Sequence, residues 1–212
     1  MAPIGAAAHA QQYKAQQAGK VWRIGWLYEG VPPSPGAPSS IDAFREEFKT
    51  LGYLDTRDYL ILTRFANGRT ERLPELGAEL TALPVDVLIA ASTPTTLAAM
   101  QATRTIPIVT IGSADPVGSG FARSYDRPGG NVTGTTLGFD EASSKWLELL
   151  KAVRGNSSRV AVIQNSTNPG IRVMLGPLET SARALTVTLT FHDFTPGIAA
   201  ASLFSAIAKE RP

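Results

Sequence analysis

Two patterns of apolar and polar positions alternate along this chain. Short, nearly continuous apolar runs, such as residues 85–91 and 106–111, each end in a polar loop that contains proline or glycine. Such runs are typical of strands buried on both faces of a parallel sheet. Between the runs, apolar residues recur every three or four positions, as at Ile41, Phe44 and Phe48, which indicates helices. The alternation predicts an α/β fold with a parallel sheet and right-handed crossovers.

The predicted elements form two cycles that meet near residue 137. The first cycle has five strands and the second has two, at residues 21–28, 59–65, 85–91, 106–111, 131–136, 159–164 and 186–194. Helices are predicted at residues 41–51, from 70 onward, at 95–103, 141–154, from 169 to about 184, and at 198–209, with a short helical turn at 118–125. We therefore predict an N-terminal α/β lobe at residues 21–136 and a partial second α/β lobe at 137–212. Residues 133–137 are the expected hinge, although a plain strand end is the alternative.

The second cycle is too short to cover its own apolar surface. Its first helix carries Trp146, Leu149, Leu150 and Val153 on one stripe, which we expect to face a core. Two strands leave sheet edges and helix faces uncovered, so we expect the second lobe to be incomplete and the chain to aggregate or dimerise.

Residues 1–20 form a separate, alanine- and glutamine-rich segment. Ala8-His9-Ala10 matches the end of a secretory signal, with cleavage after Ala10, but the basic and apolar regions that precede such a site are missing. We interpret the segment as a signal-peptide remnant followed by a disordered tail; a disordered tail alone is the alternative.

Composition excludes several classes of function. The chain of 212 residues is 43% hydrophobic and 18% charged, with a net charge of +2 and no block of like charge. This argues against a nucleic-acid surface or a polybasic membrane patch. No apolar run is long enough to span a bilayer, so direct membrane insertion is not expected. The absence of cysteine excludes disulfides, thiolate metal sites and cysteine catalysis, and it suits a periplasmic protein.

Polar residues at the ends of two predicted strands are the first candidates for a binding site. Ligands of parallel α/β sheets bind in the loops at the carboxyl ends of strands, which points to Ser92, Thr93, Ser113 and Asp115. Hydroxyl groups and a helix N-terminus at Ser92 and Thr93 suit a ligand carboxylate, and a plain N-cap is the alternative. Asp115 is expected to accept a hydrogen bond from a ligand, or else to begin a turn before a proline.

Two further candidates follow other strands. Tyr28, beside Glu29 at the end of the first strand, can stack on an apolar ligand, or it only decorates a loop. Asn165 closes the first strand of the second lobe and can reach across when the lobes shut, or it forms an Asx turn.

Catalytic and metal-binding readings find little support. The only histidine beyond the cleavage site is His192, no serine stands in a nucleophile elbow, and no metal-ligand spacing is present. We therefore expect no catalytic residues, no metal and no cofactor.

An ordered set of short segments resembles one family. These segments are residues 51–53 (LGY), 72–76 (RLPEL), 85–88 (VDVL), 92–94 (STP), 106–109 (IPIV), 115–120 (DPVGSG) and 127–134 (RPGGNVTG). In this order they resemble the substrate-binding proteins of ABC transporters, in the cluster that includes tryptophan- and tyrosine-uptake binding proteins. The resemblance covers about residues 21–212 and is more specific than any one motif.

The resemblance implies a type I periplasmic binding fold, in which two lobes close about a hinge on a small, amino-acid-like solute. It also implies a periplasmic location and ABC permease subunits as partners. The chain departs from the family pattern in its incomplete signal peptide and in the missing second half of its second lobe. A ligand-sensing ectodomain on the same fold, an α/β enzyme that uses Asp115, and a non-functional truncated fragment are the alternatives.

Overall fold

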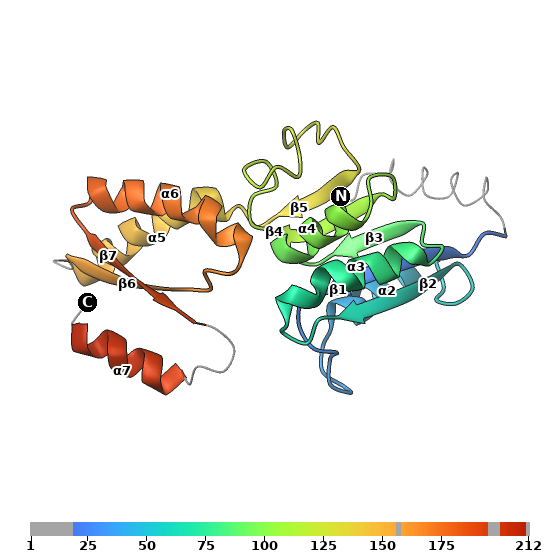
Figure 1. Cartoon of the computed structure of the whole chain (residues 1–212), viewed down its shortest axis with the longest axis horizontal. Coiled ribbons are helices and arrows are strands. Elements are labelled where there is room, and N and C mark those ends of the chain that lie inside the picture. Colours follow the sequence, from blue (N-terminus) through green and yellow to red (C-terminus); the bar gives the residue numbers. More distant parts are fainter. Residues whose placement is uncertain (1–18, 156–157, 195–199, 211–212) are drawn as a thin grey trace.

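The computed structural model describes residues 19–155, 158–194 and 200–210, which form two α/β lobes side by side along the long axis of the molecule (Figure 1). Lobe 1 contains a five-stranded sheet, and lobe 2 contains a two-stranded sheet. The five strands and two strands expected from the sequence are therefore confirmed within the described residues.

The sheet of lobe 1 has the order β2-β1-β3-β4-β5, and every neighbouring pair is parallel. Its strands are β1 (Trp22–Tyr28), β2 (Tyr59–Phe65), β3 (Val87–Ala90), β4 (Ile108–Ser113) and β5 (Val132–Thr136). The first strand of the chain thus lies inside the sheet, between β2 and β3. This order places the carboxyl ends of β1, β3 and β4 next to one another, where a parallel sheet presents its ligand site.

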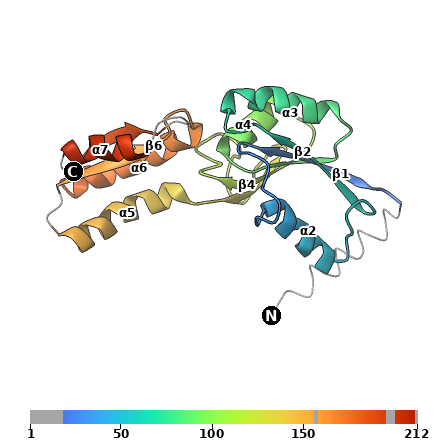
Figure 2. The same ribbon diagram turned by 90° about the horizontal axis from the view of Figure 1, so that it is seen from below.

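Helices cover both faces of this sheet. Helix α2 (Ser40–Thr50) lies on one face, and α3 (Leu73–Ala82) and α4 (Thr93–Ala102) lie on the other (Figure 2). A short 3₁₀ helix, η1 (Thr70–Arg72), leads into α3. The side chain of Ser39 accepts a hydrogen bond from the Asp42 N–H and so begins α2, and Gly52 with φ of 81° ends it, as the sequence predicted.

Each face of the sheet therefore has a core of its own. Beneath α3 and α4 the buried cluster includes Leu80, Leu88 and Ile108, and beneath α2 it includes Ile24 and Trp26. Both faces of β1 and β3 are apolar because both are covered, which explains the near-continuous apolar runs in the sequence.

The helical turn predicted at residues 118–125 is wrong, because the segment forms only turns and bends. The Asp115 carboxylate accepts hydrogen bonds from the N–H groups of Val117 and Gly118, which fixes an Asx-type turn. Gly120 then adopts φ of 74°, a left-handed conformation that a right-handed helix does not contain.

Lobe 2 pairs β6 (Arg159–Gln164) in parallel with β7 (Thr188–Asp193). Helices α5 (Phe139–Arg154) and α6 (Pro169–Ala184) lie on one side of these strands, and α7 (Ala200–Glu210) lies on the other (Figure 1). The fully buried part of this core is small, with Leu147, Leu178 and Ala182 at its centre.

The expectation that the apolar stripe of α5 faces a core is met only in part, because Trp146 and Leu150 line an apolar hollow against β6 and α6, whereas Leu149 and Val153 lie outside it. Exposed fractions are 46% for Trp146, 55% for Leu149, 40% for Leu150 and 83% for Val153. The buried face of α5 instead carries Ser143 and Leu147. A helix buries only the face that a neighbouring layer covers, and the two-stranded sheet of lobe 2 is too narrow to cover this one.

The expected boundary at residues 136/137 falls between β5 and α5, and it stays a prediction, as does the expected hinge. The predicted signal remnant lies almost wholly outside the described residues. Among the described helices, none combines the length and the apolar character needed to cross a membrane. The described residues also contain no group of acidic or histidine side chains placed to hold a metal ion.

Candidate functional site

A hollow of about 420 Å³ opens at the carboxyl ends of β1, β3 and β4. It is lined by residues in or just after the ends of these strands and by the start of α2: Tyr28, Glu29, Gly30, Ser40, Ala91, Ser92 and Ile111. Two of the six site residues predicted from the sequence, Tyr28 and Ser92, line this hollow. Its wall combines one carboxylate, three hydroxyl groups and the apolar surface of Ala91 and Ile111.

Tyr28 is held in place by aromatic stacking and by a hydrogen bond. Its ring stacks on Trp26 and Phe65, with centroid separations of 5.4 and 5.0 Å. Its hydroxyl lies 2.6 Å from the Ser40 Oγ at the start of α2. Burial raises the pKa of Tyr28 above its ordinary value, against the lowering effect of the Ser40 hydrogen bond. The hydroxyl is therefore protonated at neutral pH, so a fixed polar group stands at one side of the hollow.

Ser92 begins α4 and also contacts the hollow. It forms a capping box with Thr95, in which each side chain accepts a hydrogen bond from the other residue's backbone N–H. Its hydroxyl also donates to the Glu29 Oε2 at 3.2 Å, which links the end of β1 to the end of β3. The N-cap role considered from the sequence is thus present, and it leaves Ser92 at the wall of the hollow.

Thr93 and Ser113 lie beneath the surface rather than in the hollow. Their exposed fractions are 4% and 0%. The Thr93 Oγ1 accepts a hydrogen bond of 3.0 Å from the Ala114 N–H, which joins the start of α4 to the end of β4. The Ser113 Oγ has no hydrogen-bond partner among the described residues. A ligand role for either residue stays a prediction, and it would require the lobes to move.

A contact between the lobes contributes to the burial of Thr93. A Cβ atom added to Gly170, in the first turn of α6, would lie 2.8 Å from the Thr93 Oγ1 and 3.2 Å from the Ala114 Cβ. A Cβ added to Gly118 would lie 2.8 Å from the Val173 Cγ1. All three distances are shorter than ordinary van der Waals contact. The first turns of α6 therefore pack almost directly against the strand-end loops of lobe 1.

Asp115 and Asn165 satisfy their own loops. The Asp115 Oδ1 accepts backbone hydrogen bonds within its turn, and the Tyr125 hydroxyl lies 3.4 Å from it. The Asn165 Oδ1 accepts hydrogen bonds from the N–H and the hydroxyl of Thr167. Both turn interpretations are thus realised in this structure, and the ligand-binding roles of these two residues stay predictions.

Sequence reasoning did not select Glu29 and Ser40, which the fold brings into the hollow. Glu29 directly follows β1, so the rule that ligands bind at strand ends already pointed to it. Ser40 has no such signal, because only the position of α2 relative to β1 brings its hydroxyl to Tyr28.

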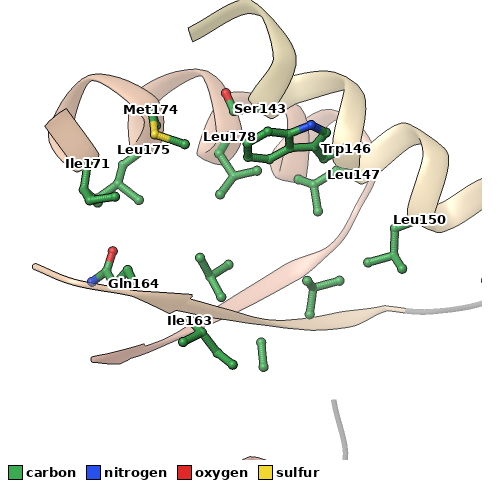
Figure 3. A pocket seen from close by; sticks show the side chains of 13 residues that line it. Ser143, Trp146, Leu147, Leu150, Ile163, Gln164, Ile171, Met174, Leu175 and Leu178 are labelled. Atoms are coloured by element: carbon green, nitrogen blue, oxygen red, sulfur yellow. The ribbon is translucent and has the colours of Figure 1, made fainter. Parts of the chain in front are cut away.

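A second hollow, of about 270 Å³, lies in lobe 2 between β6 and the helices α5 and α6 (Figure 3). Trp146 and Leu150 reach it from α5, and Ile171 and Met174 reach it from α6. No charged side chain lines it, and the Gln164 Oε1 is buried without a hydrogen-bond partner among the described residues. This hollow suits an apolar group and offers nothing to hold a charged solute.

Two lobes of parallel sheet joined in sequence, with a polar hollow at the strand ends of one lobe, define the class of two-lobed binding proteins. The solved structures support this assignment. A conserved domain protein from Vibrio cholerae O1 biovar El Tor matches with a TM-score of 0.74 at 24% identity, over 90% of this chain and 63% of that one. The ABC domain from Streptococcus pneumoniae, solved in complex with L-Trp, matches with a TM-score of 0.73 at 20% identity and the same coverage. The fold is that of the type I periplasmic binding proteins.

The family profile described as "ABC transporter substrate binding protein" matches residues 34–193, so the chain belongs to this family. A tyrosine-binding protein from Clostridioides difficile (strain R20291) is 28% identical over 151 residues, which cover 70% of this chain and 43% of that protein. The resemblance inferred from the short segments is confirmed. The family comprises extracytoplasmic solute-binding proteins and not enzymes. The chain spans less than two thirds of the length of these relatives.

Proposed function

We propose that this chain is the solute-binding component of an ABC importer, that it works in the periplasm, and that it captures an amino-acid-like solute between its lobes for delivery to permease subunits. The observation that carries the proposal is the hollow formed by Tyr28, Glu29, Ser40 and Ser92 in a chain of this family. A relative bears the name of a tyrosine-binding protein, and a solved neighbour holds L-Trp, which favours an amino acid as the solute.

The composition of the hollow supports a zwitterionic solute. A carboxylate and hydroxyl groups lie beside apolar surface, which is the mixture that fixes a small polar molecule and buries its side chain. Closure would bring the α6 side of lobe 2 onto the solute. The connection between the lobes contains Gly138, with φ of 62°, and a glycine of this kind absorbs backbone rotation readily.

Thermal unfolding with L-tryptophan, L-tyrosine and L-leucine tests the proposal. A solute that binds only the folded state raises the Tm, by an amount that grows with the ratio of its concentration to its Kd. We expect one of the three to raise the Tm in a saturable manner, while glucose, which carries no charge, leaves it unchanged. A sharp transition that none of the amino acids shifts would refute the amino-acid proposal.

A further inference from the structure

Glu29 brings an unneutralised negative charge into the hollow. Its Oε2 lies 3.2 Å from the Ser92 Oγ, and in the part of the chain that the structure describes no lysine, arginine or histidine forms an ion pair with it. Some other carboxylates of lobe 1 are paired, as Asp86 is with Lys20 and Glu79 is with Arg64. A carboxylate at the wall of the hollow that forms no ion pair can accept hydrogen bonds from a cationic group of a bound solute.

The rest of the wall limits what that cation can be. Ser92 places a hydroxyl group against the carboxylate, and Tyr28, Ala91 and Ile111 line the same hollow. A hydrated metal ion needs several oxygen ligands, and no acidic cluster stands here among the described residues. An ammonium group needs only a carboxylate and one or two hydroxyl oxygens, and its apolar substituent would lie against Ala91 and Ile111.

We propose that Glu29 recognises the ammonium group of the solute and that it selects amines over otherwise identical molecules that lack the amine. This inference rests on the proposed function and adds a specificity-determining residue to it. The same carboxylate repels a solute that carries only a negative charge, so it discriminates by attraction and by repulsion together.

Isothermal titration of the whole chain and of its Glu29→Gln variant tests the inference. The probes are L-tryptophan, L-tyrosine and L-leucine, each beside its deaminated counterpart: indole-3-propionate, 3-(4-hydroxyphenyl)propionate and 4-methylpentanoate. Replacing a charged hydrogen-bond partner by its neutral isostere removes a charge-assisted bond. We therefore expect Glu29→Gln to weaken binding of the amino acid about tenfold or more, and to leave unchanged or strengthen binding of the deaminated probe.

The matched control is Glu47→Gln, which neutralises an exposed carboxylate on α2 outside the hollow. It should bind every probe as the unmodified chain does, and Glu29→Asp, which keeps the charge, should retain part of the selectivity. If the unmodified chain binds an amino acid and Glu29→Gln binds it equally well, the role of Glu29 is overturned while the proposed function stands. If the unmodified chain binds none of the three amino acids, both fail.

Discussion

Both lobes consist of parallel strands that alternate with helices, but the sheet of lobe 1 has five strands and the sheet of lobe 2 has two. Lobe 1 encloses its central strands with neighbours on both sides and helices on both faces, and Leu88 and Ile108 are almost fully buried. In lobe 2 the same alternation of strands and helices stops at a sheet of two strands, and large apolar side chains such as Val153 and Phe204 lie in water. The difference teaches that correct local patterns do not make a core until a second layer covers them.

The largest expected effect is a difference in the free energy of unfolding between two isoleucine-to-alanine substitutions, one in each lobe. Ile108→Ala in β4 removes a fully buried side chain and should lower the free energy of unfolding by about 2–5 kcal/mol. Ile163→Ala in β6 removes a side chain that is 43% exposed and should cost less than about 1 kcal/mol.

Urea unfolding followed by tryptophan fluorescence measures both variants. Trp22 and Trp26 lie in lobe 1 and Trp146 lies in lobe 2. A Trp146→Phe background therefore follows lobe 1 for Ile108→Ala, and a background with Trp22→Phe and Trp26→Phe follows lobe 2 for Ile163→Ala. Equal losses in the two variants would show that lobe 2 has a core as complete as that of lobe 1.

The next largest effect is the difference in stability between two glycine-to-alanine substitutions, one in each lobe. Gly134 in β5 has φ of 145°, and an added Cβ would lie 1.9 Å from the carbonyl oxygen of Thr110, so Gly134→Ala should cost about 2 kcal/mol or more. Gly176 in α6 has open space around it, and Gly176→Ala should stabilise its helix by about 0.5–1 kcal/mol. Thermal unfolding distinguishes the two, and a stabilised Gly134→Ala would contradict the close packing of β5 on β4.

Self-association of the chain tests whether the exposed apolar side chains of lobe 2 form intermolecular contacts. The exposed apolar side chains on the two sides of lobe 2, Val153 on α5 and Phe204 on α7, should draw copies of the chain together, in line with the association expected from the sequence. Val153→Glu with Phe204→Glu should weaken that association about tenfold or more, because each charge must then be buried at the contact.

Sedimentation velocity at several protein concentrations checks this result. The control is Leu60→Glu with Leu97→Glu, which charges two exposed apolar positions of lobe 1. A compact monomer at every concentration would show that the exposed surface of lobe 2 does not associate.

The smallest expected effect is a pH dependence in lobe 1. Burial acts to raise the pKa of Asp86, but the Arg23 N–H at 2.8 Å and the Lys20 ammonium at 2.5 Å outweigh it, so the pKa is lowered. A carboxylate with a lowered pKa stabilises the fold above its unfolded-state pKa of about 3.9, and this contribution is lost as the pH falls through the folded-state value.

Asp86→Asn should therefore be less stable than the unmodified chain at pH 7, and the gap should shrink toward pH 3. Urea unfolding at the two pH values measures the gap. A difference that stays constant with pH would show that Asp86 acts through its shape and not through its charge.

The sequence predicted those features of the fold that depend on neighbouring residues, and it did not predict those that depend on packing between distant segments. The strand at residues 59–65 and the end of α2 at Gly52 follow from neighbouring residues, and both are found where they were expected. The exposure of Leu149 and Val153 on α5 could not be foreseen, because periodicity shows which face is apolar and not whether a partner layer exists.

The candidate site was predictable in part for the same reason. Tyr28 and Ser92 were found because strand ends can be read from the sequence, and Glu29 stood beside them. The contact of Gly170 with Thr93 could not be inferred, because it joins residues far apart in the chain and depends on the relative position of two lobes.

The place of β1 inside the sheet also has a consequence for synthesis on the ribosome. The strand that emerges first pairs on one edge with β2, but its other edge must wait for β3. At about 5–20 residues per second, that wait lasts several seconds, during which an apolar strand edge has no neighbour. A periplasmic destination would lengthen the interval, since an exported chain must stay unfolded until it has crossed the membrane. The position of β1 therefore delays completion of its pairing within the lobe 1 sheet until residues 87–90 have been synthesised.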